Sequence, residues 1–271
     1  MRNLGFAIRR AVDEIGRRDR LLAATGWLNL ALFVVMLAVA LFDTRTVMGV
    51  NPWIKPMKFA LSIAIFVWTI AWFRPYLGGG AKAGRAVSLA IAVSLAGEIA
   101  CITVQAARGT TSHYNTTTPF NAAVFAVMAA LIFVNTTAIA TVLALMTRPA
   151  RPLPPAYAWG VRLGLAAIFL GSLEGAVMIF HNAHTVGLPD GGSGLFFLNW
   201  STRAGDLRIA HFLGMHALQI LPLVGYATGR WAPAVPERQQ IGVVVAFGIT
   251  YAMAVAWTFS RARAGMPLWR I

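Results

Sequence analysis

The chain has 271 residues, of which 58% are hydrophobic and only 12% are charged, about half the charged fraction of a typical soluble domain. Lys and Arg number 23 against 9 Asp and Glu, which gives a net charge of +14, and there is a single Cys. These figures exclude a disordered chain, a disulfide-stapled secreted domain and an ordinary soluble enzyme, and they leave a polytopic membrane protein.

The first 20 residues predict an amphipathic helix that lies on the membrane surface. Val12 and Ile15 belong to an apolar stripe at helical spacing, whereas Arg9 and Arg10 lie elsewhere on the helical wheel. We expect these and the other basic side chains to meet anionic lipid headgroups. The high net charge is therefore explained by the membrane, and no nucleic-acid partner is expected.

Seven apolar runs follow, each long enough to cross a lipid bilayer. They cover residues 21–43, 57–77, 86–107, 119–147, 157–184, 208–229 and 240–260. Because every backbone polar group in lipid must be paired within the structure, these runs predict helices. The expected fold is all-α, with an interfacial helix over 1–20, a seven-helix transmembrane domain over 21–260 and a basic tail over 261–271.

The distribution of positive charge predicts the orientation of the chain. The N-terminal segment and the even-numbered connections carry most of the Lys and Arg. Since these residues accumulate on the cytoplasmic side, we expect the N-terminus in the cytoplasm and the C-terminus outside, in a bacterial inner membrane. Arg261 and Arg263 in the tail argue against this placement, because positive charge is expected on the cytoplasmic side.

Ionisable side chains occur inside the predicted spans, where they are costly. Glu98 lies deep in the third span and Glu174 in the fifth, and a charge at the bilayer centre costs roughly 2.5–3.5 kcal/mol on insertion scales. Four of the five histidines lie on the fifth and sixth spans, and the remaining one follows the third span. These histidines are His181, His184, His211, His216 and His113. Such residues mark a functional site.

The rise of about 1.5 Å per helical residue sorts the polar residues of the third, fifth and sixth spans into two depths. The deeper layer contains Glu98, Glu174, His216 and Gln219. The layer nearer the outer surface contains Gln105, Arg108, His181, His184 and His211. We predict that the three helices turn these groups toward one pocket in the outer half of the bundle. The predicted contacts of a substrate or of haem propionates are Arg108, Arg208, Gln105, Gln219 and His113.

Imidazole and carboxylate together are typical ligands of transition metals, and histidines on two helices can also hold haem. One interpretation places Fe, Zn or Cu on His181, His184 and His211, with the two glutamates as further ligands or as proton carriers. The other places haem b between the fifth and sixth spans, where His216 is a further ligand. Both predict a membrane-embedded metal- or haem-dependent oxidoreductase, acting on a lipid-soluble or acidic small molecule.

Two alternatives stay open. In the first, the protein is a transporter or channel in which Glu98 and Glu174 bind protons or cations. In the second, it is a structural or accessory membrane subunit whose polar residues only pack. The sequence contains no P-loop, dinucleotide-binding, Gly-x-Ser-x-Gly, His-Glu-x-x-His or Cys-x-x-Cys-His motif, which argues against ATP-driven transport, a serine hydrolase, a zincin and c-type haem.

Overall fold

The computed structural model describes residues 2–192 and 194–269. Over these residues the chain forms eight α-helices, of which seven are long and apolar enough to cross a membrane. The predicted all-α transmembrane bundle is therefore confirmed. Met1, Ser193, Arg270 and Ile271 lie outside the described residues, and with them the outermost ends of the predicted interfacial helix and basic tail.

Each membrane-spanning helix begins at or before the apolar run that predicted it, and four of the seven end one to four residues before that run does. Their bounds are α1 Arg2–Arg18, α2 Arg20–Ala40, α3 Ile54–Phe73, α4 Gly80–Ala107, α5 Pro119–Met146, α6 Pro155–His181, α7 Leu207–Trp231 and α8 Glu237–Arg263. The largest difference is in α4, which begins at Gly80 rather than at 86 and so includes Lys82 and Arg85. Charged side chains near a helix end can reach water or headgroups, so the helix continues past the apolar run.

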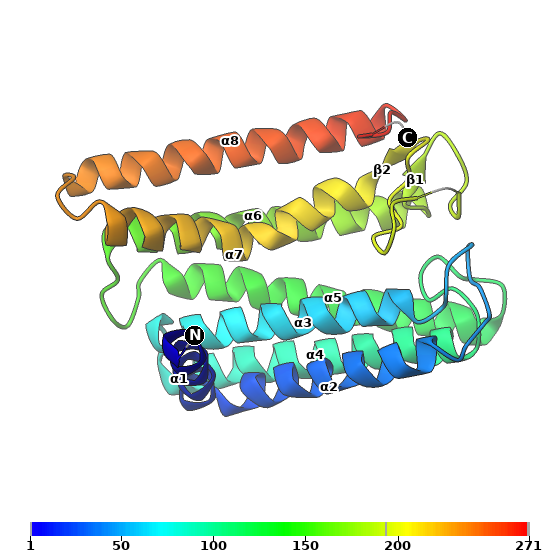
Figure 1. Cartoon of the computed structure of the whole chain (residues 1–271), viewed down its shortest axis with the longest axis horizontal. Coiled ribbons are helices and arrows are strands. Elements are labelled where there is room, and N and C mark those ends of the chain that lie inside the picture. Colours follow the sequence, from blue (N-terminus) through cyan, green and yellow to red (C-terminus); the bar gives the residue numbers. More distant parts are fainter. Residues whose placement is uncertain (1, 193, 270–271) are drawn as a thin grey trace. The chain divides into compact units, whose positions relative to one another are not determined.

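The chain divides into two compact units, Met1–Arg151 and Pro152–Ile271, which we call the first and the second unit. In the first unit α3 packs against α2 and α4, and α5 packs against α4. Figure 1 shows these four helices running side by side, whereas α1 is seen end-on and lies across the ends of α2 and α3. The first unit is thus a four-helix bundle with a crossing helix at one end.

The crossing helix is held in place by its last turn. The Arg18 guanidinium lies 4.0 Å above the ring of Trp72 and donates to the Trp72 carbonyl at 2.6 Å. It also pairs with Glu14 at 2.8 Å. Asp19 then caps α2 by accepting a hydrogen bond from the backbone N–H of Leu22. The cap starts the new helix, and the stacked arginine fixes the angle between α1 and the bundle.

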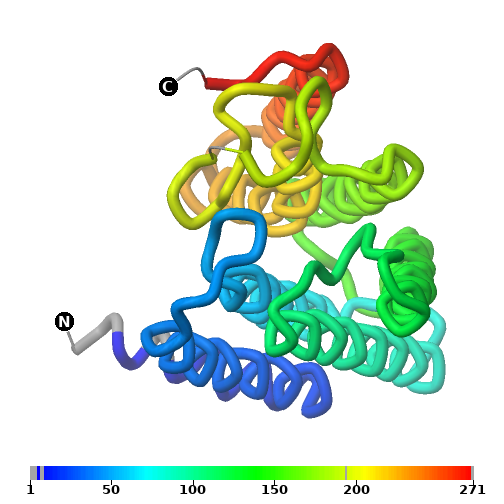
Figure 2. Tube along the Cα trace, turned by 90° about the vertical axis from the view of Figure 1, so that its right-hand side faces the viewer, coloured from blue at the N-terminus to red at the C-terminus, as the bar shows by residue number. Residues whose placement is uncertain are grey.

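The opposite end of the first unit carries the 41–53 and 108–118 connections, and we call it the loop end. Figure 2 shows both connections crossing the ends of the helices. Arg45 ties the first connection to the end of α4, because its Nη1 donates to the Ala107 carbonyl at 3.0 Å, while Asp43 holds the same guanidinium at 2.6 Å. The loop end is therefore a structured surface.

In the second unit α6 and α7 approach through glycines, and α8 packs against both. A Cβ at Gly171 of α6 would lie 2.9 Å from the carbonyl carbon of Gly214 on α7. A Cβ at Gly160 would collide with the Leu221 carbonyl. Small residues let two helix backbones come this close, as is typical of helix pairs in membranes.

The connection from α6 to α7 folds over the ends of these helices. Its base is closed by two short antiparallel strands, β1 Thr185–Val186 and β2 Gly205–Asp206, in which Thr185 pairs with Asp206. Figure 2 shows the segment between them, drawn in yellow, lying over the helix ends. We call this folded connection, between the end of α6 and the start of α7, the cap. The histidines near the end of α6 and the start of α7 border it.

Candidate functional site

Glu98 is buried inside the first unit. Its side chain is only 1% exposed, and neither carboxylate oxygen has a hydrogen-bond donor among the described residues. Ile102 and Gln105, which share its face of α4, are 1% and 0% exposed. This face of α4 is therefore turned into the protein and away from lipid.

The connection after α4 brings a histidine to this carboxylate. Gly109, at a φ of 69°, ends the helix, with its own N–H bonded to Ala106 and that of Thr110 bonded to Gln105. The chain then turns back, and Nε2 of His113 lies 3.9 Å from Oε1 of Glu98.

A cation completes this group, which we call the Glu98 cluster: Lys55, Glu98 and His113. Nζ of Lys55, in the first turn of α3, lies 3.0 Å from Nδ1 of His113. The imidazole thus stands between an ammonium and a carboxylate. The cluster contains a base, an acid and a titratable ring, which are the groups that proton transfer requires.

Aromatic rings surround the imidazole of His113. The ring centres of Phe59, Tyr114 and Phe125 lie 6.0, 5.9 and 6.3 Å from its own. Because Phe59 belongs to α3 and Phe125 to α5, the imidazole is held between two helices. These rings limit the access of water, which strengthens electrostatic interactions inside the cluster.

A second polar network lies nearer the loop end. Arg108 donates to Gln105 at 2.9 Å and to Asn121 of α5 at 3.0 Å, and Gln105 also donates to Asn121. The Arg108 guanidinium lies 4.3 Å from the ring centre of Phe120. The two predicted binding residues of α4 thus contact each other, and together they tie the end of α4 to the start of α5.

In the second unit, His211 of α7 docks onto α6. Its Nδ1 lies 2.7 Å from the carbonyl oxygen of Gly171, and its Cε1 lies 3.4 Å from where a Cβ of Gly175 would stand. A carbonyl oxygen can only accept, so Nδ1 carries the hydrogen. In the neutral ring Nε2 then keeps its lone pair, which is the form that binds metals.

Glu174 of α6 and His216 of α7 are half-buried. Oε2 of Glu174 is buried and has no hydrogen-bond partner within the described chain. His216 shares a hydrogen bond with the Gln219 side chain and lies 4.2 Å from the ring of Phe212. Of the predicted deeper layer, His216 and Gln219 are therefore in contact.

His181 and His184, which follow Glu174 in the sequence, hold the connection between α6 and α7 in place. Nδ1 of His184 donates to Asp190 at 2.8 Å, and the same carboxylate accepts from the backbone N–H of Thr185. Nε2 of His181 donates to the Thr185 carbonyl at 3.1 Å. Burial raises the pKa of Asp190, but the hydrogen bonds with His184 and with the backbone outweigh it and hold the pKa well below its usual range.

Arg208, a predicted contact of an acidic group, is paired within its own chain. Its Nε and Nη2 both donate to the carboxylate of Asp206, at 2.9 and 2.6 Å, and Nη2 also donates to the Asn199 carbonyl. Asp206 in turn caps α7 by accepting from the backbone N–H of Arg208. This two-point pairing fixes the base of the cap.

The predicted residues form separate groups within each unit. In the second unit, His184 contacts Asp190 and His211 contacts Gly171, and in the parts of the chain that the structure describes no three His, Cys, Asp or Glu side chains gather to hold a metal ion. The metal and haem sites remain predictions. The common pocket also remains a prediction, because it would combine Glu98 of the first unit with residues of the second unit.

Sequence reasoning missed Lys55 and Asn121. A lysine in the first turn of a span is normally an interfacial anchor, but in the structure Lys55 also contacts His113. Asn121 follows Thr118, which caps α5 by accepting from the Asn121 N–H. The signal in the sequence that could have identified Asn121 is an amide side chain in the first turn of an otherwise apolar helix.

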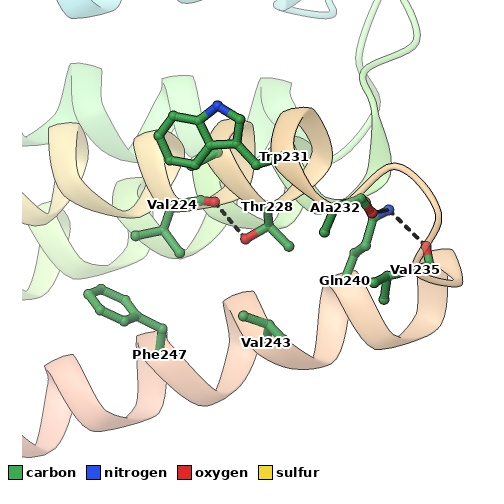
Figure 3. A pocket seen from close by; sticks show the side chains of 9 residues that line it. Val224, Thr228, Trp231, Ala232, Val235, Gln240, Val243 and Phe247 are labelled. Carbon is green, nitrogen blue, oxygen red and sulfur yellow. Dashed lines mark hydrogen bonds between the residues drawn. The ribbon is translucent and has the colours of Figure 1, made fainter.

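A groove lies between α7 and α8, near the connection that joins them (Figure 3). Its volume is about 460 Å³, and apolar side chains such as Val224, Val243 and Phe247 line it. Its polar members are already bonded, because Thr228 donates to the Val224 carbonyl and Gln240 to backbone carbonyls. The groove therefore offers no polar group for chemistry.

Comparison of the chain with protein-family models, with curated proteins and with solved structures finds no significant match. The function must therefore be argued from the side chains described above.

Proposed function

We propose that the protein carries protons or small cations across the membrane by way of Glu98 and Glu174. The observation that carries the proposal is the state of Glu98, whose carboxyl group is 1% exposed and has no hydrogen-bond donor among the described residues. A bare carboxylate in such surroundings is costly, and binding a proton or a cation removes that cost. Glu98 is thus suited to take up and release a positive charge.

Glu174 supplies the second carboxyl group. The residue is half-buried, and its Oε2 is buried without a partner in the described residues. A membrane-spanning helix of each unit therefore contributes a carboxyl group with a buried, unpartnered oxygen. Ionisable residues in membrane spans are typical of ion and proton pathways. The proposal includes the predicted orientation, in which the N-terminus is cytoplasmic and the loop end of the first unit faces outside.

Flux measurements on the purified protein in liposomes test this function. We expect an imposed potential to drive uptake of protons, or of Na⁺ or K⁺, detected with an internal dye. Glu98→Gln and Glu174→Gln should each lower the rate at least tenfold. Glu237→Gln removes an exposed carboxylate at the start of α8 and should transport normally. Wild-type flux in Glu98→Gln, or no flux above empty liposomes, contradicts the proposal.

A second candidate is the metal- or haem-dependent oxidoreductase, favoured by the orientation of His211. Metal-bound histidines usually donate their other ring N–H to a carbonyl or carboxylate, as Nδ1 of His211 does to Gly171. We expect this protein, if it is a redox enzyme, to purify with Fe, Cu, Zn or haem b, and His211→Ala to lower the content of that group. Elemental analysis with an optical spectrum decides it, and a folded sample free of metal and colour contradicts it.

A further inference from the structure

We infer that His113 passes protons between the loop end of the first unit and Glu98, with Lys55 setting the tautomer of its ring. This inference rests on the proposed function of Glu98, in the form in which protons are the ions carried. Its basis is the order of the three groups, with Lys55 3.0 Å from one ring nitrogen and Glu98 3.9 Å from the other.

The hydrogen-bonding partners determine which ring nitrogen carries the hydrogen. The Lys55 ammonium has hydrogens and no lone pair, so Nδ1 of His113 must accept from it. The Ser112 hydroxyl, 3.1 Å from the same nitrogen, can donate as well. In a neutral ring the hydrogen is then on Nε2, which is the nitrogen that faces Glu98. The ring therefore presents a proton to the buried carboxylate.

The transfer step follows from this arrangement. The Nε2–H bond breaks as a Glu98 oxygen takes the proton, while Nδ1 takes a proton from the Lys55 ammonium. The products are a carboxylic acid, a neutral ring of the opposite tautomer and a lysine amine, which regains its proton from water at the loop end. Because 3.9 Å exceeds a hydrogen bond, a rotation of the His113 or Glu98 side chain must first shorten this gap.

The surroundings direct the proton along this route. Phe59, Tyr114 and Phe125 pack around the imidazole. Of the other titratable groups, Tyr114 contacts the ring, and Cys101 interacts electrostatically with Glu98. Neither provides a base of ordinary pKa near 7, so His113 is the group suited to exchange protons near neutral pH.

The test follows the protonation of Glu98 itself. The protein in liposomes is taken rapidly from alkaline to acidic pH, and the carboxylic-acid C=O infrared band that Glu98→Gln lacks is recorded against time. We expect His113→Gln to slow the appearance of this band at least tenfold, and added imidazole to restore the rate in His113→Ala. Phe133→Leu, at an exposed position of α5, removes no titratable group and should stay within threefold of wild type.

The outcomes separate the relay from the proposed function. A wild-type rate in His113→Gln, no recovery with imidazole, or no Glu98 band at any pH overturns the relay. If both His113 variants fail to fold, Lys55→Gln, which keeps a hydrogen-bond donor but has no proton to give up, must slow the band at least tenfold, and a wild-type rate overturns the relay. Loss of flux in Glu98→Gln together with wild-type protonation in His113→Gln would leave the transport function standing and remove only this route.

Discussion

At the scale of single residues, Asp190 shows how one carboxylate can organise a connection. It holds the ring of His184 and the backbone N–H groups of His184 and Thr185. These bonds form just after Asn182, which follows the last residue of α6 and adopts a left-handed conformation. The position of the predicted ligands His181 and His184 therefore depends on a residue that the sequence analysis did not single out.

The lowered pKa of Asp190 predicts a pH-dependent stability. The pKa of the carboxyl group is below its unfolded value of about 3.9, so its contribution is present above that pH and is lost as the pH falls through the folded pKa. We expect Asp190→Asn to cost about 1–3 kcal/mol at pH 7. Thermal unfolding in detergent should show that the difference in unfolding temperature between Asp190→Asn and wild type narrows below pH 4. A difference that stays constant down to pH 2 would contradict this account.

The residues of the site differ in how well the sequence predicted them. Burial of the Glu98 face follows from the spacing of Glu98, Ile102 and Gln105 on one helix, and the structure has all three buried. The approach of His113 to Glu98 depends instead on the turn after α4, where Gly109 and Tyr114 have positive φ. Such turns are set by local backbone geometry, which hydropathy and spacing do not encode.

At the scale of helices, the pairing of α6 with α7 depends on backbone contact. Gly171 and Gly214 allow the helices to meet so closely that the His211 ring reaches the Gly171 carbonyl at 2.7 Å. Because no larger side chains separate the two backbones here, van der Waals packing across this contact stabilises the helix pair. The orientation of His211 is therefore a consequence of the glycines.

Adding a methyl group at this contact should separate the helices. In Gly171→Ala the new Cβ would stand 2.9 Å from the backbone of Gly214, which cannot move aside as a side chain can. We expect a loss of about 1–3 kcal/mol from overpacking. The control Gly242→Ala, on α8 where a Cβ meets nothing within 4 Å, should be neutral or slightly stabilising. Equal unfolding temperatures for the two variants in detergent would contradict this packing role.

The helices themselves were the most predictable level of the structure. All seven predicted spans are helices, because a long apolar run in lipid has no other way to pair its backbone groups. Their ends were predicted less well, as in α4, where polar residues before the apolar run continue the helix. Caps such as Asp19 and Asp206 fix these ends, and they act through single hydrogen bonds that hydropathy does not register.

At the scale of the whole molecule, each of the two units has a carboxyl group with a buried, unpartnered oxygen in a membrane-spanning helix, among the residues that the structure describes. In the first unit Glu98 is linked through His113 to Lys55, and in the second Glu174 has a buried oxygen without a partner in the described chain. Large apolar side chains such as Val93 of α4 and Leu170 of α6 are exposed on the same helices, as a lipid-embedded protein requires. We propose that these acids carry a positive charge across the membrane.

Electrical recording from the protein in a planar bilayer tests this claim most directly. With different pH, Na⁺ and K⁺ on the two sides, we predict a current whose reversal potential follows the gradient of protons or of one cation. The current should be lost in Glu98→Gln and kept in Glu237→Gln. A protein that is folded and inserted but passes no current under any of these gradients, or whose current is unchanged in Glu98→Gln, would contradict the account.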